Sequence, residues 1–550
     1  MNAKTFRTSE EVDFLIVGSG AAGGVLAREL ARERLNVVVL EQGPRIYPSD
    51  LRHDELKNWF LGGLVVDPIK NRQSFRRSAS ETAVAPAVRP PLFYARGVGG
   101  SSMHFTANYW RFREIDFRER SVFGGIPGTG FADWPISYAE LEPYYTKVDW
   151  DIGVSGQAGV DPNDPPRSKP YPMPPVRVKS SGVLFERGAR KLGWHPVPAP
   201  LAINSMPYGG RPACVHCGFC HGFGCEVMAK ASTAWTVIPQ AEATGHCEIR
   251  PDSYVSRLET DKRGRVTGAA YFDRDGKEHF QRARAVVLAA NGGETPRLLL
   301  NSANPKFPQG IANSSGLVGK YLMFNYTARV NAVFEHELNE YKSVQVTRIL
   351  HDFYDSDPKR GFYGGGGLDC RIGPQPMFWA IRTAGDGPGW GKGFKEHLRE
   401  FPRSMQVSCH TTSLALESNN ISIDPTLKDA WGIPAIRVTY RDHPDDLAMA
   451  RWLQDRGMEI MDAAGAQRAY KSPVTESSLA FHLLGTCRMG NDPASSVVDK
   501  FHRSHDVPNL FICDGSSLVT SGRGQPTMTI QALAFRAGEH IARFAHRNEI

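Results

Sequence analysis

The sequence lacks any long run of apolar residues. A helix that spans a lipid bilayer needs roughly 18 or more such residues, whereas the apolar runs Phe14–Val17 and Val37–Leu40 have only the length of buried strands. The N-terminal segment MNAKTFRTSEEVDF has neither an apolar core nor a twin arginine. We therefore expect no transmembrane segment and no export signal of the chain's own.

The chain also lacks a basic block. Lys and Arg outnumber Asp and Glu by 65 to 58, but the excess is spread along the sequence, which makes nucleic acid a poor candidate partner. Cysteine is scarce, with 9 in 550 residues, and this excludes a disulfide scaffold. With 41% hydrophobic residues the chain can bury a large core, and its length favours two closely connected domains.

The first 41 residues carry a dinucleotide-binding pattern. An apolar run, Val12–Val17, leads into Gly18, Gly20 and Gly23, which form GxGxxG, and a second run ends at Glu41. The glycines allow a tight turn, close approach to a pyrophosphate and close helix packing, and the phosphates lie at the N-terminus of a helix. Glu41 can accept hydrogen bonds from a ribose. The motif predicts a βαβ unit but does not choose between NAD and FAD.

A second glycine-rich segment, RGVGGSSMHFTANYWRF at 96–112, lets the backbone lie against a flat ligand. This segment resembles the first signature of the glucose-methanol-choline (GMC) family of oxidoreductases, and the N-terminal turn with Glu41 is similar to that family's FAD-binding opening. Further similar segments follow in family order at 133–145, 289–300 and 509–535. The resemblance implies an α/β (α+β two-domain) fold, with a Rossmann-like FAD-binding domain and a substrate domain built on an antiparallel sheet.

The resemblance also implies which residues contact FAD. His104 occupies a position where some sugar-oxidising relatives carry a histidine bonded covalently to the flavin and others carry one without the bond, and both alternatives stay open. The expected cofactor-binding residues are Gly18, Gly20, Gly23, Glu41, Arg96, Gly99, Gly100, Ser101, His104, Asn108, Val255, Asp514, Pro526 and Thr527.

A catalytic pair is expected near the C-terminus. The segment FHLLGTCRMG at 481–490 resembles the family's HxxGTCRMG, which makes His482 the candidate base, and imidazole has the unperturbed pKa nearest neutrality. The family usually places a histidine or asparagine before the proline of a later segment, where this chain has Gln525. The glutamine amide can donate to a substrate oxygen, but its extra methylene displaces the donor. The helix that begins at Thr527 presents its N-terminus to the negative charge of a reduced flavin.

Four cysteines are crowded in one short segment. Cys214, Cys217, Cys220 and Cys225 form CxxCxxCxxxxC, and thiolates so close together can bind one soft metal centre. The spacing favours an iron–sulfur cluster over structural zinc, whose cysteine pairs are usually separated by a longer loop. The CxxCH motif at 217–221 is also typical of c-type haem attachment. Inert thiols are the fourth alternative.

The cysteine segment is similar to an insert in the large subunits of bacterial sugar and gluconate dehydrogenases of the GMC family. There an iron–sulfur cluster passes electrons onward from the flavin. The resemblance implies a three-iron cluster on Cys214, Cys220 and Cys225, or a four-iron cluster if Cys217 is also a ligand.

Domain boundaries follow from composition and from these motifs. We expect the FAD-binding domain to comprise 1–150, 205–328 and 475–550, with a cysteine-rich insert at 212–232, and the substrate domain and connector to comprise 151–204 and 329–474. The proline-rich stretch 161–176 predicts an extended connector. Alternation at Ser404–Leu416 and Asn420–Asp424 predicts antiparallel strands of a sheet that covers the substrate.

Together, the motifs and the resemblance predict an FAD-dependent dehydrogenase that oxidises a hydroxyl group of a sugar, polyol or other alcohol. Electrons would pass through the cluster to an acceptor such as a c-type cytochrome subunit, and a small chaperone-like subunit would accompany export. The protein is then either cytoplasmic or periplasmic by export with that partner. The alternatives are an oxygen-using oxidase with structural cysteines, a flavin-containing lyase in which His482 acts as acid and base, and a non-catalytic electron carrier.

Overall fold

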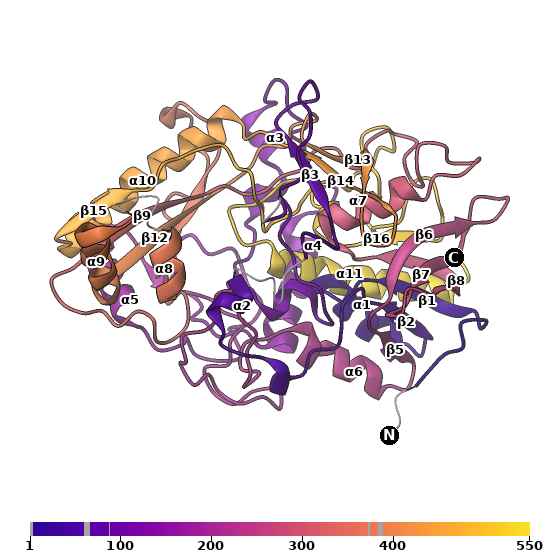
Figure 1. The fold of residues 1–550 in the computed structure, drawn as a ribbon, viewed down its shortest axis with the longest axis horizontal. Coiled ribbons are helices and arrows are strands. Elements are labelled where there is room, and N and C mark those ends of the chain that lie inside the picture. The colour runs from indigo at the N-terminus through magenta and orange to yellow at the C-terminus, as the bar shows by residue number, and fades with distance from the viewer. Residues whose placement is uncertain (1–3, 60–66, 87–88, 372–374, 383–388) are drawn as a thin grey trace.

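The structure is a computed structural model that describes residues 4–59, 67–86, 89–371, 375–382 and 389–550. The molecule is elongated, with two separate large sheets (Figure 1). In the described part of the chain, no helix has both the length and the apolar character needed to cross a lipid bilayer.

The first sheet forms the half of the molecule that holds both chain termini (Figure 1). Its strand order is β5-β2-β1-β8-β7-β6, and β16 also pairs with β8. The strands β5, β2, β1, β8 and β16 are parallel, whereas β6 and β7 run antiparallel at the other end. The strands are β1 (Val12–Val17), β2 (Val37–Leu40), β5 (Cys247–Arg250), β6 (Tyr254–Thr260), β7 (Val266–Phe272), β8 (Glu278–Leu288) and β16 (Leu510–Ile512).

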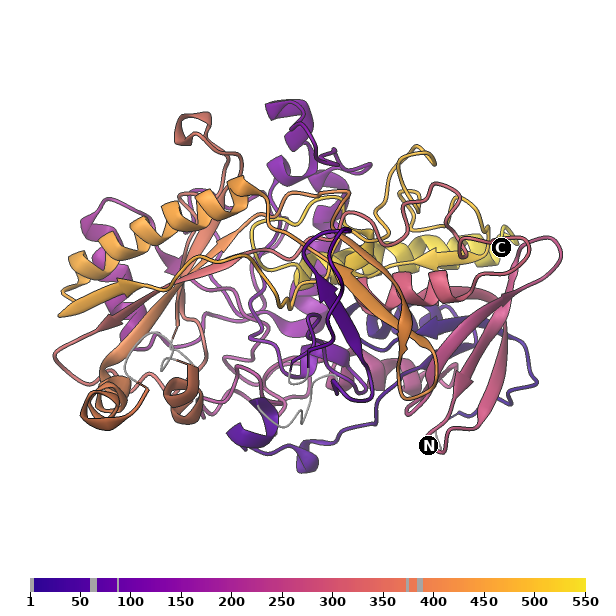
Figure 2. The same cartoon turned by 45° about the horizontal axis from the view of Figure 1, so that its top comes forward.

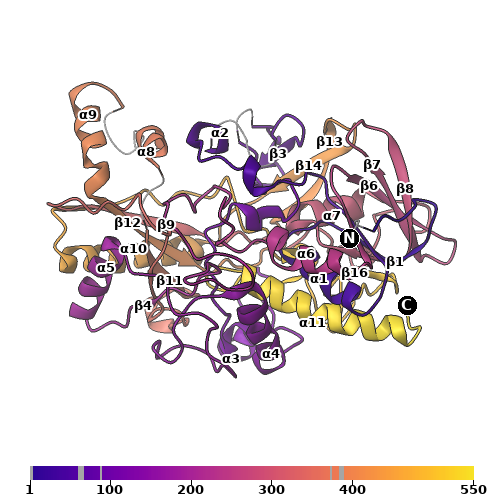
Figure 3. The same ribbon diagram turned by 90° about the horizontal axis from the view of Figure 1, so that it is seen from below.

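Helices cover this sheet because its central strands are apolar on both faces. Val37–Leu40 is buried at every position, as a parallel strand between two helical layers must be. The long helix α11 (Thr527–His546), yellow in Figure 3, packs against α1 (Ala21–Arg32). Gly538 permits this approach, because a Cβ there would lie 2.7 Å from Cβ of Glu29. The remaining covering helices are α6 (Val237–Ala243) and α7 (Asn291–Asn301).

The second large sheet has six antiparallel strands in the order β15-β9-β12-β11-β10-β4. The helix α10 (Pro444–Ala464) lies along it, as the long orange helix of Figure 2 shows, and α5 (Ser180–Lys191) packs against α10. The strands are β4 (Val197–Pro198), β9 (Thr327–Val333), β10 (Arg348–Leu350), β11 (Gly366–Arg371), β12 (Ser404–Thr411) and β15 (Arg468–Lys471).

The strand predicted at 404–416 is β12 of this sheet, but the strand predicted at 420–424 belongs elsewhere. It begins β13 (Asn420–Lys428), which pairs with β14 (Pro434–Thr439) and, through it, with β3 (Gln73–Arg76) in a third sheet. Apolar side chains of this sheet, Ile436 among them, join a core with Leu92 rather than with the six-stranded sheet. Alternation correctly predicted a strand, but it carried no information about the strand's partner.

The other helices are short or lie at the surface. The segment expected at 133–145 contains α4 (Tyr138–Val148), which begins after a capping box of Ser137 and Glu140. The proline-rich stretch 161–176 contains no helix or named strand. The remaining helices are α2 (Glu55–Trp59), α3 (Glu119–Phe123), α8 (Pro376–Arg382) and α9 (Gly391–Glu400).

Candidate active site

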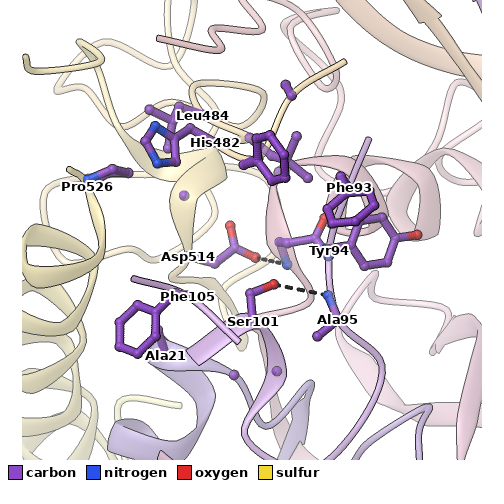
Figure 4. A pocket seen from close by; sticks show the side chains of 18 of the residues that line it. Ala21, Phe93, Tyr94, Ala95, Ser101, Phe105, His482, Leu484, Asp514 and Pro526 are labelled. Atoms are coloured by element: carbon purple, nitrogen blue, oxygen red, sulfur yellow. Dashed lines mark hydrogen bonds between the residues drawn. The ribbon is translucent and has the colours of Figure 1, made fainter. Parts of the chain in front are cut away.

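A cavity of about 670 Å³ is lined by residues from both large sheets. The carboxyl ends of β1 and β8 open into it, as expected for the ligand site of a parallel sheet. In Figure 4, His482 and Pro526 lie toward the top of this cavity, and Ala21 and Ser101 lie toward the bottom.

The glycine turn after β1 has the geometry that the motif predicts. Gly18 has φ +95°, and a Cβ there would lie 2.5 Å from the Ala289 carbonyl oxygen. At Gly23 a Cβ would lie 1.9 Å from the Gly18 carbonyl oxygen. At Gly20 the nearest atom would be Cα of Gly100 at 3.9 Å, and Gly20 lines the cavity at the N-terminus of α1. With no acidic residue in its first turn, that helix terminus suits a phosphate.

Glu41 supports the turn from the end of β2. Its Oε2 accepts hydrogen bonds from the Ser19 backbone N–H at 3.1 Å and the Ser19 hydroxyl at 2.8 Å, and its Oε1 accepts from the Gly43 N–H at 3.0 Å. Burial raises the pKa of Glu41, although these hydrogen bonds act in the opposite direction. The carboxylate lines the cavity, and its contact with a ribose stays a prediction.

The segment 95–108 supplies unsatisfied polar atoms to the cavity wall. His104 Nε2 and both amide atoms of Asn108 are buried without a hydrogen-bond partner in the described structure. Burial, and secondarily the charge of Lys230, lowers the pKa of His104 to about 4, so the ring is neutral. Buried polar groups without partners are rare. These atoms are therefore suited to hydrogen-bond a ligand rich in donors and acceptors, such as a flavin.

The C-terminal end of the chain closes the cavity. Asp514 lines the cavity, where Figure 4 labels it. It accepts hydrogen bonds from the Asn291 N–H at 3.0 Å, the Thr295 hydroxyl at 2.6 Å and the Ser516 N–H at 2.8 Å. Pro526 and Thr527 place the N-terminus of α11 in the cavity wall. That helix terminus carries partial positive charge.

Most of the expected cofactor-binding residues reach the cavity. Gly23, Arg96 and Gly99 do not: Gly23 packs inside the turn, Gly99 lies against Ser232, and Arg96 lies over the ring of Trp431. Their contacts with FAD stay predictions. The expected residues that line the cavity are Gly18, Gly20, Glu41, Gly100, Ser101, His104, Asn108, Val255, Asp514, Pro526 and Thr527.

His482 is held in one tautomer by Asn325. Its Nδ1 lies 3.2 Å from Asn325 Oδ1, and the Asn325 amide nitrogen donates to the carbonyl oxygens of Thr411, Ser521 and Gly522 at 3.2 to 3.3 Å. Because these three acceptors fix the amide orientation, Nδ1 of His482 carries the proton and Nε2 carries a lone pair. Burial, then the charges of His410 and Arg371, lower the pKa of His482 to about 3.

Side chains of the six-stranded sheet line the same cavity as His482. Gln525 lines the cavity as expected from the sequence, but Gln406, Ser408 and His410 of β12 and Arg371 of β11 also line it. Sequence reasoning missed these residues. The available signal was the alternation along β12, which places every second residue on one face.

The cysteine segment lies beside the cavity. All nine cysteines of the chain are free thiols. Burial, with smaller contributions from Cys214, Cys217 and Cys225, raises the pKa of Cys220 to about 12, although the charge of Lys230 acts in the opposite direction. The buried Lys230 ammonium donates to the carbonyl oxygens of Cys220 and Phe223, both at 2.8 Å, and of Phe105 at 2.7 Å.

The thiols do not meet at one point in this arrangement. Among the described residues, no three His, Cys, Asp or Glu side chains are placed so that they could hold a metal ion. Two backbone N–H groups do point at the sulfurs, from His216 to Cys214 at 3.4 Å and from Lys230 to Cys225 at 3.5 Å.

The glycine turn on a parallel sheet, the unsatisfied polar wall and the helix N-termini indicate a dinucleotide-binding protein. More specifically, the chain belongs to the GMC oxidoreductase family. The N-terminal family model matches residues 12–324 and the C-terminal model matches residues 415–534. This confirms the resemblance and the two-domain fold class drawn from the sequence.

Similar proteins match the chain over nearly its whole length. It is 37% identical to 2-methyl-1,2-propanediol dehydrogenase from Mycolicibacterium austroafricanum, with 98% of this chain and 96% of the relative covered. It is 31% identical to the fructose dehydrogenase large subunit from Gluconobacter japonicus, with 96% and 97% covered. A structure of a formate oxidase variant from Aspergillus oryzae has the same fold, with a TM-score of 0.68, 13% identity and coverage of 99% and 100%.

Proposed function

We propose that the protein is an FAD-dependent dehydrogenase that oxidises a hydroxyl group of a sugar, polyol or other alcohol. The observation that carries the proposal is the free Nε2 lone pair of His482 in the wall of a cavity that also contains the dinucleotide turn. Two of the most similar relatives are named as dehydrogenases of a diol and of a sugar, which supports this substrate class.

In this reaction the flavin, His482, two helix N-termini and Gln525 each have a separate role. Bound FAD supplies an acceptor for the hydride that leaves the carbinol carbon. His482 Nε2 would accept the proton of the hydroxyl as the carbonyl group forms, so that loss of the hydride does not leave a protonated, positively charged carbonyl. The N-terminus of α1 would hold the pyrophosphate of bound FAD, and the N-terminus of α11 would stabilise negative charge near the flavin ring. Gln525 is proposed to donate its amide to the substrate oxygen.

Anaerobic titration tests this proposal. The purified protein, mixed with a panel of sugars, polyols and simple alcohols, should lose its visible flavin absorption with at least one of them. His482→Phe should keep its flavin and fail to bleach. Product formation without bleaching would instead support a lyase, fast re-oxidation by oxygen with peroxide formation would support an oxidase, and the absence of both product and bleaching would support an electron carrier.

We further propose that Cys214, Cys220 and Cys225, with or without Cys217, hold a three-iron or four-iron cluster that passes electrons to a separate acceptor. The donor set suits such a cluster, because all four thiols are free and two already accept N–H groups. Binding would require the thiols to come closer together. The name of the fructose dehydrogenase large subunit supports the idea of partner subunits, here a c-type cytochrome and a small chaperone-like protein.

Anaerobic purification tests the cluster independently of the flavin. Iron and acid-labile sulfide should be present, with an electron paramagnetic resonance signal that disappears in Cys220→Ala. Zinc would indicate a structural metal site, covalent haem would indicate a c-type haem attachment motif, and no metal would indicate inert thiols. None of these results would contradict the proposal for the flavin. Denaturation would show whether His104 holds the flavin covalently, because the yellow colour would then stay with the protein.

A further inference from the structure

His410 brings a second imidazole into the cavity from the six-stranded sheet. Along β12, Met405, Val407 and Cys409 belong to the hydrophobic core that includes α10, whereas Gln406, Ser408 and His410 line the cavity. The period of two along a strand produces this division. His410 therefore lies on the face of the sheet that a bound substrate would contact.

The ring of His410 is also held in one tautomer. Its Nε2 lies 2.8 Å from Asp369 Oδ2, and the same carboxylate accepts a hydrogen bond from Arg371 Nε at 2.7 Å and a second from its Nη2. Burial alone would raise the pKa of Asp369, but Arg371 and His410 more than offset it and lower the pKa to about 2. Asp369 is thus an acceptor only. Arg371 Nη2 also lies 3.1 Å from His410 Nε2, but it already donates to the same carboxylate, and the carboxylate contact is the shorter one. We therefore place the proton on Nε2 and the lone pair on Nδ1.

His410 and His482 belong to one local arrangement. Asn325, which orients His482, donates to the carbonyl oxygen of Thr411, the residue after His410. His410 also packs beside Gly524, where a Cβ would lie 2.9 Å from Cβ of His410. The residue after that glycine is Gln525, the expected partner of His482, so His410 lies against the backbone that positions Gln525.

We propose that these two imidazoles select substrates with two neighbouring hydroxyl groups. His482 Nε2 accepts a hydrogen bond from the reacting hydroxyl, and His410 Nδ1 accepts one from the hydroxyl on the adjacent carbon. Both free nitrogens are acceptors, so the cavity is matched to a ligand that brings two O–H donors. This inference rests on the proposed function and narrows its substrate class to 1,2-diols, including polyols and sugars.

The proton and electron balance is the same as for a simple alcohol. The reacting hydroxyl gives its proton to His482 and its carbon gives a hydride to FAD, while the adjacent hydroxyl keeps its proton and remains bound to His410. A substrate without the adjacent hydroxyl leaves the buried acceptor unpaired. A site built to bind a hydroxyl group discriminates strongly against the analogue that lacks it, because an unpaired buried polar group is unfavourable.

Matched substrate pairs test the proposal in the flavin-loaded protein. The pairs are 1,2-propanediol with 1-propanol and glucose with 2-deoxyglucose, and the readout is the anaerobic rate of flavin bleaching. For a pair that reacts, we expect kcat/KM for the diol-bearing member to exceed that for its partner by about 100-fold or more. In His410→Phe, which keeps an aromatic ring beside Trp110, the ratio should fall to within about 5-fold.

His351→Phe is the matched control. His351 is also buried, also pairs with a carboxylate, Asp161 at 3.1 Å, and also contacts Trp110 at 4.8 Å between ring centroids, but it does not line the cavity. This variant should keep the wild-type ratio. If His410→Phe fails to retain FAD, His410→Leu is measured in the same way.

The outcomes separate the two proposals. If neither pair nor any other alcohol or sugar bleaches the flavin, the proposed function fails. If bleaching occurs but both members of a pair react equally in the wild type, or if His410→Phe keeps the preference, the role of His410 is overturned while the proposed function stands.

Discussion

At the scale of single residues, the chemical nature of a histidine's partner decides what the ring can do. Asn325 gives His482 an uncharged oxygen, which fixes the ring without favouring its protonation. Asp369 gives His410 a carboxylate, although Arg371 neutralises much of its charge. The two rings are therefore both oriented and both neutral near pH 7, as burial lowers the pKa of each.

The depressed pKa of His482 predicts an unusual pH dependence. The base must be neutral to accept a proton, and a lowered pKa means that the neutral form persists at lower pH. We expect the rate of flavin bleaching to show no acid limb centred near the ordinary histidine pKa of about 6.5. Stopped-flow measurements between about pH 5 and pH 8 would show this, provided that an indifferent buffer series is used.

Replacing the Asn325 amide with a carboxylate tests whether the partner of His482 sets this pH dependence. Asn325→Asp puts a negative charge beside Nδ1, which should raise the pKa of His482 and bring an acid limb into the measured range. The variant also loses the donors to three carbonyl oxygens, so its stability should fall. A wild-type limb near pH 6.5 would contradict the lowered pKa of His482.

Two glycines of the turn should respond differently to alanine. Gly20→Ala adds a methyl group to the open cavity, so the protein should fold but bind FAD about 10-fold to 100-fold more weakly, as expected when a contact to phosphate is blocked. Gly18→Ala should destabilise the protein itself, because of its positive φ and the Ala289 carbonyl. Flavin content and thermal unfolding measure the two effects, and equal stability loss in both variants would contradict this division.

At the scale of secondary-structure elements, one face of β12 packs into the hydrophobic core and the other face lines the cavity. Its residues 405, 407 and 409 pack into the core, and its residues 406, 408 and 410 line the cavity. The two functions alternate along one strand because the strand period is two. A shift of one residue in register would move every cavity residue into the core.

Substitutions at neighbouring residues of β12 should therefore differ in effect, because one should lower stability and the other should raise KM. Val407→Ala removes buried methyl groups and should destabilise the protein by about 1 to 3 kcal/mol without altering the preference between substrates. Ser408→Ala removes a buried hydroxyl that has no partner in the described structure, so it should raise KM for the substrate and leave stability nearly unchanged. Thermal unfolding and steady-state kinetics on both variants test the prediction. A change in KM for Val407→Ala alone would refute it.

At the scale of the whole molecule, a buried arginine just before Gln525 links the segment between β16 and α11 to the start of α3 and to the loop after β10. Arg523 is fully buried and pairs with Asp116 and Glu119, and its Nε donates to the Tyr354 carbonyl oxygen at 2.7 Å. Tyr354 follows β10 of the six-stranded sheet, and its hydroxyl donates to Asp116 at 2.6 Å. This network orders the polypeptide that carries Gln525 into the cavity.

Removal of this charge should destabilise the molecule strongly. Arg523→Met leaves two buried carboxylates unpaired, a loss of about 3 to 5 kcal/mol for a buried ion pair. Arg547→Met, whose ion pair with Glu549 is exposed, should change stability by less than about 1 kcal/mol. Thermal unfolding followed by flavin release compares them, and similar midpoints for the two variants would show that the network is not structural.

The sequence by itself determined the features that depend on neighbouring residues. The turn at Gly18, Gly20 and Gly23, the family membership and the placement of His482 in a motif follow from local spacing, because backbone geometry and phosphate binding act within a few residues. The tertiary structure alone decided the partners of His482. Asn325, which contacts His482, and His410, which lines the same cavity, come from distant segments with no motif. The three residues come together through long-range packing, which local patterns do not encode.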